Sequence, residues 1–295
     1  MTTPAQLLRE SYPSPTNPLD ALAAPAALEL SEARILLTHV LGWPRTALIT
    51  RADEDLPPAL VEQYRSLAVR RLAGEPIAQL VGSREFYGLS FSVTPDVLIP
   101  RPETELLVEL ALQACSPLAQ PSVLDLGTGS GAIAIALAAH CPQAKVSATD
   151  RSPAALAVAR ANAARLLSPE RPGGPVNWLC GDWFEALSDT PPASFDVIVS
   201  NPPYIHAEDP HLAQGDLRFE PRGALTDGAD GLSALRAIIE RAPEFLAPAG
   251  VLWLEHGYDQ STAVAAMLRT RGMQAVRSVD DLAGIARVTG ARMAQ

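Results

Sequence analysis

The chain has little cysteine and no long apolar run. Its 295 residues include three scattered cysteines, Cys115, Cys141 and Cys180, with no CxxC pair. Such cysteines cannot form a disulfide framework, and they are better explained as small buried hydrophobes than as metal ligands. No run approaches the ~20 apolar residues of a membrane span, and the N-terminus lacks the pattern of a signal peptide. We expect a cytoplasmic protein with no metal and no membrane contact.

Positive charge is also scarce. Lys and Arg number 23 against 33 Asp and Glu, so the formal net charge is −10. This balance argues against a protein that wraps nucleic acid through phosphate contacts, although it allows a small basic patch. With 47% hydrophobic and 19% charged residues the composition is that of an ordinary soluble protein. We therefore expect no stable binding of nucleic acid.

The N-terminal part has a helical pattern. Residues 1–28 are rich in proline and alanine, and they predict a lead-in with one short helix. From Ser31 apolar residues recur at helical spacing up to a stop at Gly42, and a second amphipathic helix is predicted over 60–72. We assign residues 1–75 to a small helical domain, and the role of the first 28 residues stays open.

A connector with a different pattern follows over residues 76–100. Residues 77–81 and 86–93 are apolar, β-leaning stretches separated by a short polar turn, which predicts a β-hairpin linker. The segment ends at Arg101, which stands between two prolines and leads into a helix that starts near Glu103.

The remainder, residues 101–295, alternates predicted strands and helices. The alternation indicates an α/β domain, a parallel sheet covered by helices on both faces. The expected strands are 123–126, 145–149, 176–180, 195–200 and 251–255, with one or two more in the tail to 288, and the expected helices are 132–140, 153–166, 232–245 and 260–271.

The most informative segment, Asn201-Pro202-Pro203-Tyr204, follows the predicted strand 195–200. In open α/β sheets ligands bind at the carboxyl ends of strands. The Asn201 side-chain oxygen can accept one N–H of a planar amino group, and the Pro202 backbone carbonyl can accept the other. Proline fixes the chain direction, and Tyr204 offers a flat face for stacking. The segment predicts a site for an amide or an aromatic amine.

A glycine loop follows the first strand of the α/β part. Its glycines allow backbone to approach a ligand closely, and read through Ala132 it also satisfies the dinucleotide fingerprint. Asp125, before the first glycine, would repel a pyrophosphate but could hold a positively charged amino-acid head. Three alternating glycines are typical of S-adenosylmethionine enzymes. The predicted cofactor loop is Asp125-Leu126-Gly127-Thr128-Gly129-Ser130-Gly131.

Two more acids end predicted strands. Asp150 could accept both ribose hydroxyls of an adenosine group, or it could cap the helix that follows. Asp182 could receive the adenine amino group while Trp183 packs on the ring; the alternative is a surface acid beside a half-buried tryptophan.

Together these residues resemble the class I S-adenosylmethionine-dependent methyltransferases, and more closely the release-factor glutamine N5-methyltransferases of the PrmC/HemK family. The resemblance covers nearly the whole chain from about Ser31 and includes every proposed site position. Further motifs that carry it are Glu85-Phe86-Tyr87-Gly88, Leu98-Ile99-Pro100-Arg101-Pro102-Glu103-Thr104-Glu105, Arg218-Phe219-Glu220-Pro221 and Leu254-Glu255-His256-Gly257.

The resemblance implies an N-terminal helical bundle, a β-hairpin linker and a Rossmann-like seven-stranded methyltransferase sheet. It implies methyl transfer from S-adenosylmethionine, leaving S-adenosylhomocysteine, to the glutamine of the Gly-Gly-Gln motif in peptide chain release factors, and hence a role in translation termination. The helical domain would dock the release factor. The implied catalytic residues are Asn201, Pro202 and Tyr204, the substrate-binding residues also include Pro203, and the cofactor-binding residues are Asp125, Gly127, Thr128, Gly129, Ser130, Gly131, Asp150, Asp182, Trp183 and Asn201.

Three other functions compete with this interpretation. An N-methyltransferase acting on adenine or guanine could clamp a flipped base with the same tetrapeptide. A non-catalytic binding protein could keep the fold, and a nicotinamide-dependent oxidoreductase could use the glycine loop. The roles of Arg101, Glu220 and Glu255 stay open, and His256 is better explained as a hydrogen-bonded support residue than as a base.

Overall fold

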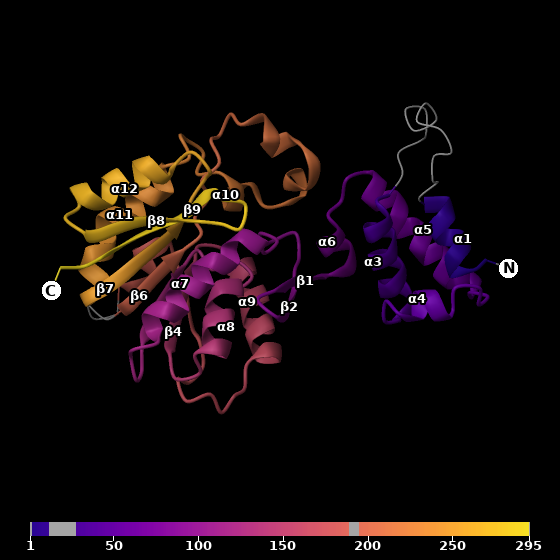
Figure 1. Ribbon diagram of the computed structural model, residues 1–295, viewed down its shortest axis with the longest axis horizontal. Coiled ribbons are helices and arrows are strands. Elements are labelled where there is room, and N and C mark those ends of the chain that lie inside the picture. Colours follow the sequence, from indigo (N-terminus) through magenta and orange to yellow (C-terminus); the bar gives the residue numbers. More distant parts are fainter. Residues whose placement is uncertain (1, 12–27, 189–194, 295) are drawn as a thin grey trace. The chain divides into compact units, whose positions relative to one another are not determined.

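Figure 1 shows the computed structural model, which describes residues 2–11, 28–188 and 195–294. The chain divides into two compact units, Met1–Gly82 and Ser83–Gln295. Unit 1 has one hydrophobic core of its own, and unit 2 has a core on each face of its large sheet. None of the described helices is long and apolar enough to cross a membrane.

Unit 1 is helical, as its periodicity predicts. Helix α3 (Leu30–Leu41) ends before Gly42, whose φ of 63° is the left-handed conformation that commonly terminates a helix. Leu36, Leu37 and Tyr64 are buried in the shared core. The short N-terminal helix is confirmed, whereas the rest of the predicted lead-in, residues 12–27, lies outside the described residues. The helices of unit 1 are α1 (Pro4–Ser11), α3 (Leu30–Leu41), α4 (Ala47–Thr50), α5 (Pro58–Leu72) and α6 (Ile77–Val81).

The predicted strand over residues 77–81 is wrong, because this stretch forms helix α6 and buries Leu80 in the core of unit 1. Periodicity alone cannot distinguish a strand from a helix in so short an apolar run. The hairpin itself exists, but it pairs β1 (Ser83–Phe86) with β2 (Leu89–Ser92). Both turn residues, Tyr87 and Gly88, have the positive φ that a tight hairpin turn requires.

The large sheet of unit 2 has seven strands in the order β5-β4-β3-β6-β7-β9-β8. The first five strands of this order are parallel, and β9 is antiparallel to both β7 and β8. This confirms the Rossmann-like seven-stranded sheet. The strands are β3 (Ser122–Leu126), β4 (Lys145–Asp150), β5 (Asn177–Cys180), β6 (Phe195–Ser200), β7 (Leu246–Glu255), β8 (Gln274–Asp280) and β9 (Ala286–Arg292).

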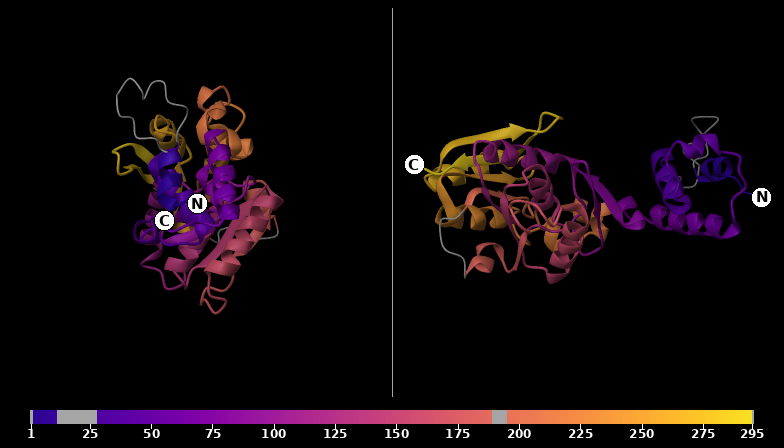
Figure 2. Two further views of the ribbon diagram at one scale, coloured as in Figure 1. Left: turned by 90° about the vertical axis from the view of Figure 1, so that its right-hand side faces the viewer. Right: turned by 90° about the horizontal axis from the view of Figure 1, so that it is seen from below.

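Helices cover both faces of this sheet (Figure 1). Because side chains alternate along a strand, Val123 joins the core under one layer of helices and Leu124 the core under the other. In Figure 2 the yellow strands β8 and β9 form one end of unit 2. The first layer contains α7 (Glu105–Cys115), α8 (Ala132–His140) and α9 (Pro153–Leu166), and the second contains α11 (Ser233–Phe245) and α12 (Ser261–Thr270).

The order of the strands places a crevice in the sheet. From β3 the chain continues to β4 and β5 on one side, and then crosses to β6 and β7 on the other. Such a switch point between β3 and β6 opens a ligand site at the carboxyl ends of the strands. Short helical turns surround these ends: η1 (Pro102–Thr104), η2 (Trp183–Leu187), η3 (Pro210–Ala213), η4 (Gly215–Phe219) and α10 (Arg222–Leu225).

Candidate active site

A cavity of about 420 Å³ lies at the carboxyl ends of β3, β4 and β6. Its volume falls in the range of roughly 300–1,000 Å³ that small-molecule sites occupy. Seven of the residues predicted from the sequence line it together: Gly127, Gly129, Asp150, Asp182, Trp183, Asn201 and Pro203.

Asp150 anchors the glycine loop rather than the helix after it. Its Oδ2 accepts a hydrogen bond from the Gly129 N–H at 2.8 Å, and its Oδ1 accepts from the Ser152 N–H at 2.8 Å. The cap of α9 is Ser152, whose hydroxyl accepts from the Ala155 N–H. The alternative that Asp150 caps this helix is therefore wrong. A carboxylate can accept further bonds, so Asp150 can still bind hydroxyl groups in the cavity.

The glycine loop is tightly packed. The N–H groups of Gly127 and Thr128 both donate to the Thr149 carbonyl at 2.9 Å. Gly131 has a φ of 82°, and a Cβ there would lie 2.8 Å from Ile135 and 3.1 Å from Ala159. A side chain at this position would clash as well as strain the backbone.

Four of the predicted cofactor residues do not line this cavity: Asp125, Thr128, Ser130 and Gly131. All four are buried. Asp125 Oδ2 accepts from the Thr128 hydroxyl at 2.6 Å and from the Ala134 N–H at 3.2 Å, whereas Oδ1 has no hydrogen-bond partner among the described residues. Burial raises the pKa of Asp125 to about 7. Asp125 thus supports the glycine loop through buried hydrogen bonds to Thr128 and Ala134.

Trp183 has an unusual backbone. Its φ of 44° lies in the left-handed region, which strains a bulky residue. The indole lies so close to the loop that a Cβ on Gly127 would be 3.0 Å from a ring carbon. Such strain gathers at functional sites. The strained backbone holds the Trp183 ring on the wall of the cavity, next to Asp182.

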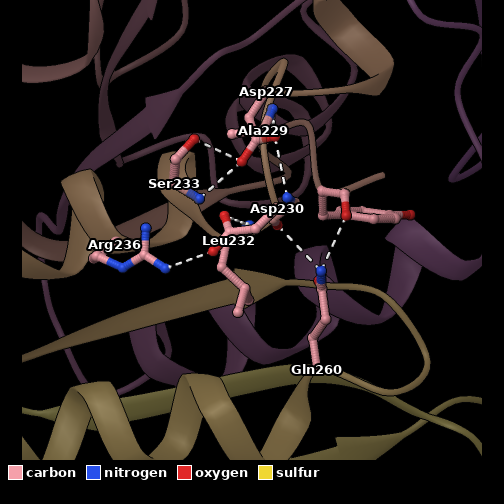
Figure 3. Close-up of polar contacts among 9 residues, drawn as sticks. Asp227, Ala229, Asp230, Leu232, Ser233, Arg236 and Gln260 are labelled. Carbon is pink, nitrogen blue, oxygen red and sulfur yellow. Dashed lines mark hydrogen bonds and ion pairs between the residues drawn. The ribbon is translucent and has the colours of Figure 1, made fainter. Parts of the chain in front are cut away.

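The sequence did not predict a further loop of the cavity wall, formed by residues 227–233 (Figure 3). The Asp227 carboxylate accepts from the N–H groups of Ala229, Gly231 and Ser233 and from the Ser233 hydroxyl, at 2.6–3.1 Å. Partial burial alone would raise the pKa of Asp227, but these hydrogen bonds lower it below its ordinary value. The run Asp-Gly-Ala-Asp-Gly is turn-forming, and that signal could have identified the loop.

Gln260 links this loop to the Asn201–Tyr204 segment (Figure 3). Its Nε2 donates to the Tyr204 carbonyl at 3.0 Å and to the Gly231 carbonyl at 3.1 Å, while its Oε1 accepts from the Gly257 N–H at 2.9 Å. Gly231 packs so tightly on the segment that a Cβ there would lie 2.4 Å from the Tyr204 carbonyl oxygen. Gln260 and Gly231 therefore hold the backbone of the tetrapeptide at the Tyr204 carbonyl.

A smaller cavity of about 70 Å³ adjoins the first. Asn201 lines both cavities, and Pro202 and Tyr204 line the smaller one. The Asn201–Tyr204 segment therefore borders two cavities of different size. The tyrosine hydroxyl donates to Glu255 Oε1 at 3.2 Å, and burial raises the pKa of Tyr204 above its ordinary value.

The acids and bases with open roles have structural partners. Glu220 is buried, forms an ion pair with Arg101 and accepts from the Ile99 N–H at 2.9 Å. His256 is fully buried, and its ring nitrogens contact the Thr289 hydroxyl at 2.7 Å and the Gly257 carbonyl at 2.9 Å. Burial lowers the pKa of His256, so the predicted supporting role agrees with its contacts.

Comparisons with known proteins match both units. The family described as PrmC N-terminal domain matches residues 22–82, and the family described as methyltransferase small domain matches residues 102–216. A release factor glutamine methyltransferase of Burkholderia pseudomallei is 59% identical, over 97% of this chain and 99% of the relative. A release factor glutamine methyltransferase of Bordetella pertussis is 57% identical, over 92% of this chain and 97% of the relative.

One solved structure shares the fold with a TM-score of 0.50 and 24% identity. It is a 16S rRNA methyltransferase of T. thermophilus in complex with AdoMet and guanosine, and the match covers 72% of this chain and 49% of that one.

Proposed function

Since this chain belongs to the release factor glutamine methyltransferases, we propose that its site transfers the methyl group of S-adenosylmethionine to the side-chain nitrogen of the Gly-Gly-Gln glutamine in peptide chain release factors. The observation that carries this proposal is the position of Asn201, which lines both the larger and the smaller cavity. A residue there can face the methyl donor and the acceptor amide at once.

The larger cavity fits the cofactor. Backbone of Gly127 and Gly129 would border the methionine part, Asp150 would accept the ribose hydroxyls, and Asp182 and Trp183 would hold the adenine. When bound, S-adenosylmethionine supplies a methyl group that its sulfonium already activates. Thr128, Ser130 and Gly131 would act by shaping the loop, and contact of Asp125 with the amino group of the cofactor stays a prediction.

The smaller cavity suits a glutamine side chain. By the same volume measure one water needs roughly 10–15 Å³, so about 70 Å³ accommodates several atoms of a slender chain. The high identity to release factor enzymes over nearly the full chain disfavours the nucleobase alternative.

Orientation is the main chemical task of this site. The amide nitrogen of glutamine is a poor nucleophile because its lone pair is delocalised into the carbonyl. The Asn201 Oδ1 and the Pro202 carbonyl can accept its two N–H bonds, aim the nitrogen and favour its pyramidalisation. Positioning of this kind contributes up to ~7–11 kcal/mol in favourable cases. Methyl transfer leaves the amide nitrogen with two protons and a positive charge, and this cation is acidic enough to release one proton to water, so no side chain needs to act as a base.

The helical unit, Met1–Gly82, would supply the docking surface for the release factor, away from the reacting glutamine. Support comes from the family match over residues 22–82 and from the exposed apolar side chains of Ile49, Val69 and Leu72.

A methyl-transfer assay tests the proposed function. The purified chain is incubated with labelled S-adenosylmethionine and one of three acceptors: a release factor, the same factor with its Gly-Gly-Gln glutamine substituted, or duplex DNA. We expect label on the unmodified factor alone. Label on DNA alone would establish the nucleobase alternative, and equal label on both release factors would place the reaction at another residue.

A further inference from the structure

Among the described residues, the Asn201 side chain has one hydrogen bond, a tether through its Nδ2 end. Its Nδ2 donates to the Thr104 hydroxyl oxygen at 3.1 Å. Thr104 ends η1 and is 4% exposed, whereas Asn201 is half-buried, so this contact is partly shielded from water. A carboxamide has a donor end and an acceptor end, and the tether determines which end is free. With Nδ2 engaged, Oδ1 remains as the free acceptor.

Glu255, at the end of β7, influences which group donates the hydrogen bond between Asn201 and Thr104. This carboxylate is 1% exposed, and the hydroxyls of both Tyr204 and Thr104 interact with it. Oε1 accepts from Tyr204, whereas Oε2 has no hydrogen bond of standard geometry among the described residues. Because an ionised carboxylate only accepts, a Thr104 hydroxyl that turns its proton toward Glu255 would leave its lone pairs for Asn201.

Electrostatics agree with this direction. Burial raises the pKa of Glu255 to about 7, and the interactions with the hydroxyls of Thr104 and Tyr204 counteract the rise. Both hydroxyls therefore favour the ionised form of the carboxyl group. Neither Thr104 nor Glu255 lines either cavity, and their contacts with Asn201 and Tyr204 give them an indirect route to the reaction.

We propose that Thr104 and Glu255 are positioning residues that orient the Asn201 carboxamide with its oxygen toward the substrate amide. The reversed orientation would set the Asn201 NH₂ group against the NH₂ group of glutamine, donor against donor. The same carboxylate also fixes the Tyr204 hydroxyl, so one buried acid orders both ends of the Asn201–Tyr204 segment. This role rests on the proposed function, since it requires a glutamine acceptor in the smaller cavity.

A matched pair of variants isolates the hydroxyl. Thr104→Val keeps the shape of the side chain but removes the hydroxyl, and Thr104→Ser keeps the hydroxyl. We expect Thr104→Val to lower kcat for release factor methylation about tenfold, the scale of one net hydrogen bond, and Thr104→Ser to retain wild-type kcat. The KM for the release factor, the calorimetric affinity for S-adenosylmethionine and the melting temperature should be the same in both variants.

Solvent exchange of the Asn201 side-chain amide provides a second measurement that does not depend on catalysis. In ¹⁵N NMR spectra, the Asn201 side-chain amide is assigned by its loss in Asn201→Asp. Its protons should be protected from solvent exchange in the wild type and in Thr104→Ser, and unprotected in Thr104→Val. Glu255→Gln, which removes the charge at nearly constant volume, should lower both the protection and kcat, and it serves if Thr104→Val does not fold.

The outcomes separate the two proposals. If the wild type methylates the release factor but Thr104→Val and Thr104→Ser have equal kcat, the positioning role is wrong while the function stands. If the wild type does not methylate the release factor, the proposed function itself fails, and protection of the Asn201 amide still reports whether the tether exists.

Discussion

The two cavities that meet at Asn201 have different kinds of wall. The larger, about 420 Å³, is bordered by glycine backbone and by carboxylates on separate loops. The smaller, about 70 Å³, has Asn201, Pro202 and Tyr204 among its lining residues, and partly buried hydrogen bonds hold Asn201 and Tyr204. The contrast indicates a division of labour. In the proposed reaction, contacts in the larger cavity would supply affinity for the cofactor, whereas the smaller cavity would position one substrate nitrogen and so supply rate.

The largest expected effect follows from Asn201→Ala. This change should abolish methyl transfer, because a hydrogen bond that aims the reacting nitrogen is lost; comparable losses elsewhere cost on the order of 100- to 1,000-fold. Affinity for S-adenosylmethionine should stay within about tenfold, or ~1.4 kcal/mol. Single-turnover kinetics and calorimetry on the same protein measure the two quantities. Turnover at the wild-type rate would refute the role of Asn201.

Asp150→Ala should produce the opposite pattern. Hydrogen bonds to charged groups contribute about 1.5–3 kcal/mol, so affinity for S-adenosylmethionine should fall roughly 10- to 100-fold while kcat at saturating cofactor changes less. Part of the loss would come through the loop, because Asp150 also holds the Gly129 N–H. Calorimetry decides the matter, and an unchanged affinity would remove Asp150 from the cofactor site.

A smaller effect on rate is expected for Gln260→Glu. The variant keeps an oxygen for the Gly257 N–H but loses the Nε2 bonds to the carbonyls of Tyr204 and Gly231. One or two lost hydrogen bonds correspond to a decrease in kcat of about three- to tenfold. Gln274→Glu, the same change at an exposed position of β8, is the matched control. Equal kinetics for both variants would contradict the view that Gln260 holds the segment.

The smallest effect on binding is expected for Asp125→Asn, which should act on stability instead. The pKa of Asp125 is raised to about 7 in the folded chain, against ~3.9 in the unfolded chain. The contribution of this carboxyl group to the free energy of unfolding is therefore complete below pH ~4 and is lost as the pH rises through about 7. The variant should therefore lose less stability than the wild type between about pH 5 and about pH 8. The variant still loses some stability over this pH range, because the pKa of Glu255 is also raised to about 7.

Urea unfolding midpoints at the two pH values measure this difference. Identical pH dependence in wild type and variant would show that the Asp125 carboxyl is not held protonated in the fold. A loss of S-adenosylmethionine affinity as large as that of Asp150→Ala would instead support direct contact of Asp125 with the cofactor.

The sequence predicted the features that depend on local pattern. The strand before Asn201 and the glycine loop after β3 are continuous motifs, and the carboxyl ends of parallel strands meet at one edge, so their convergence followed from the α/β alternation. The strand over residues 77–81 was wrongly predicted because five apolar residues carry no distinctive period. The burial of Asp125 was also not predictable, since its position at a strand end does not reveal that the loop folds over it.

The supports of the site depend on distant parts of the chain. Thr104 and Asn201 are 97 positions apart, and Gln260 and Tyr204 are 56 apart. Nothing in the local pattern around Thr104 or Gln260 distinguishes a positioning side chain from a surface one. Only the packing of η1 and α12 against the strand ends brings these polar groups to the tetrapeptide.

The central claim is that Asn201 and Pro202 aim a glutamine side-chain nitrogen at the methyl donor. The most direct test is fragmentation mass spectrometry of a release factor after reaction with the wild-type chain and S-adenosylmethionine. A single methyl group on the side-chain nitrogen of the Gly-Gly-Gln glutamine, absent after reaction with Asn201→Ala, is the predicted result. A methyl group on any other residue, or the same product from Asn201→Ala, would contradict it.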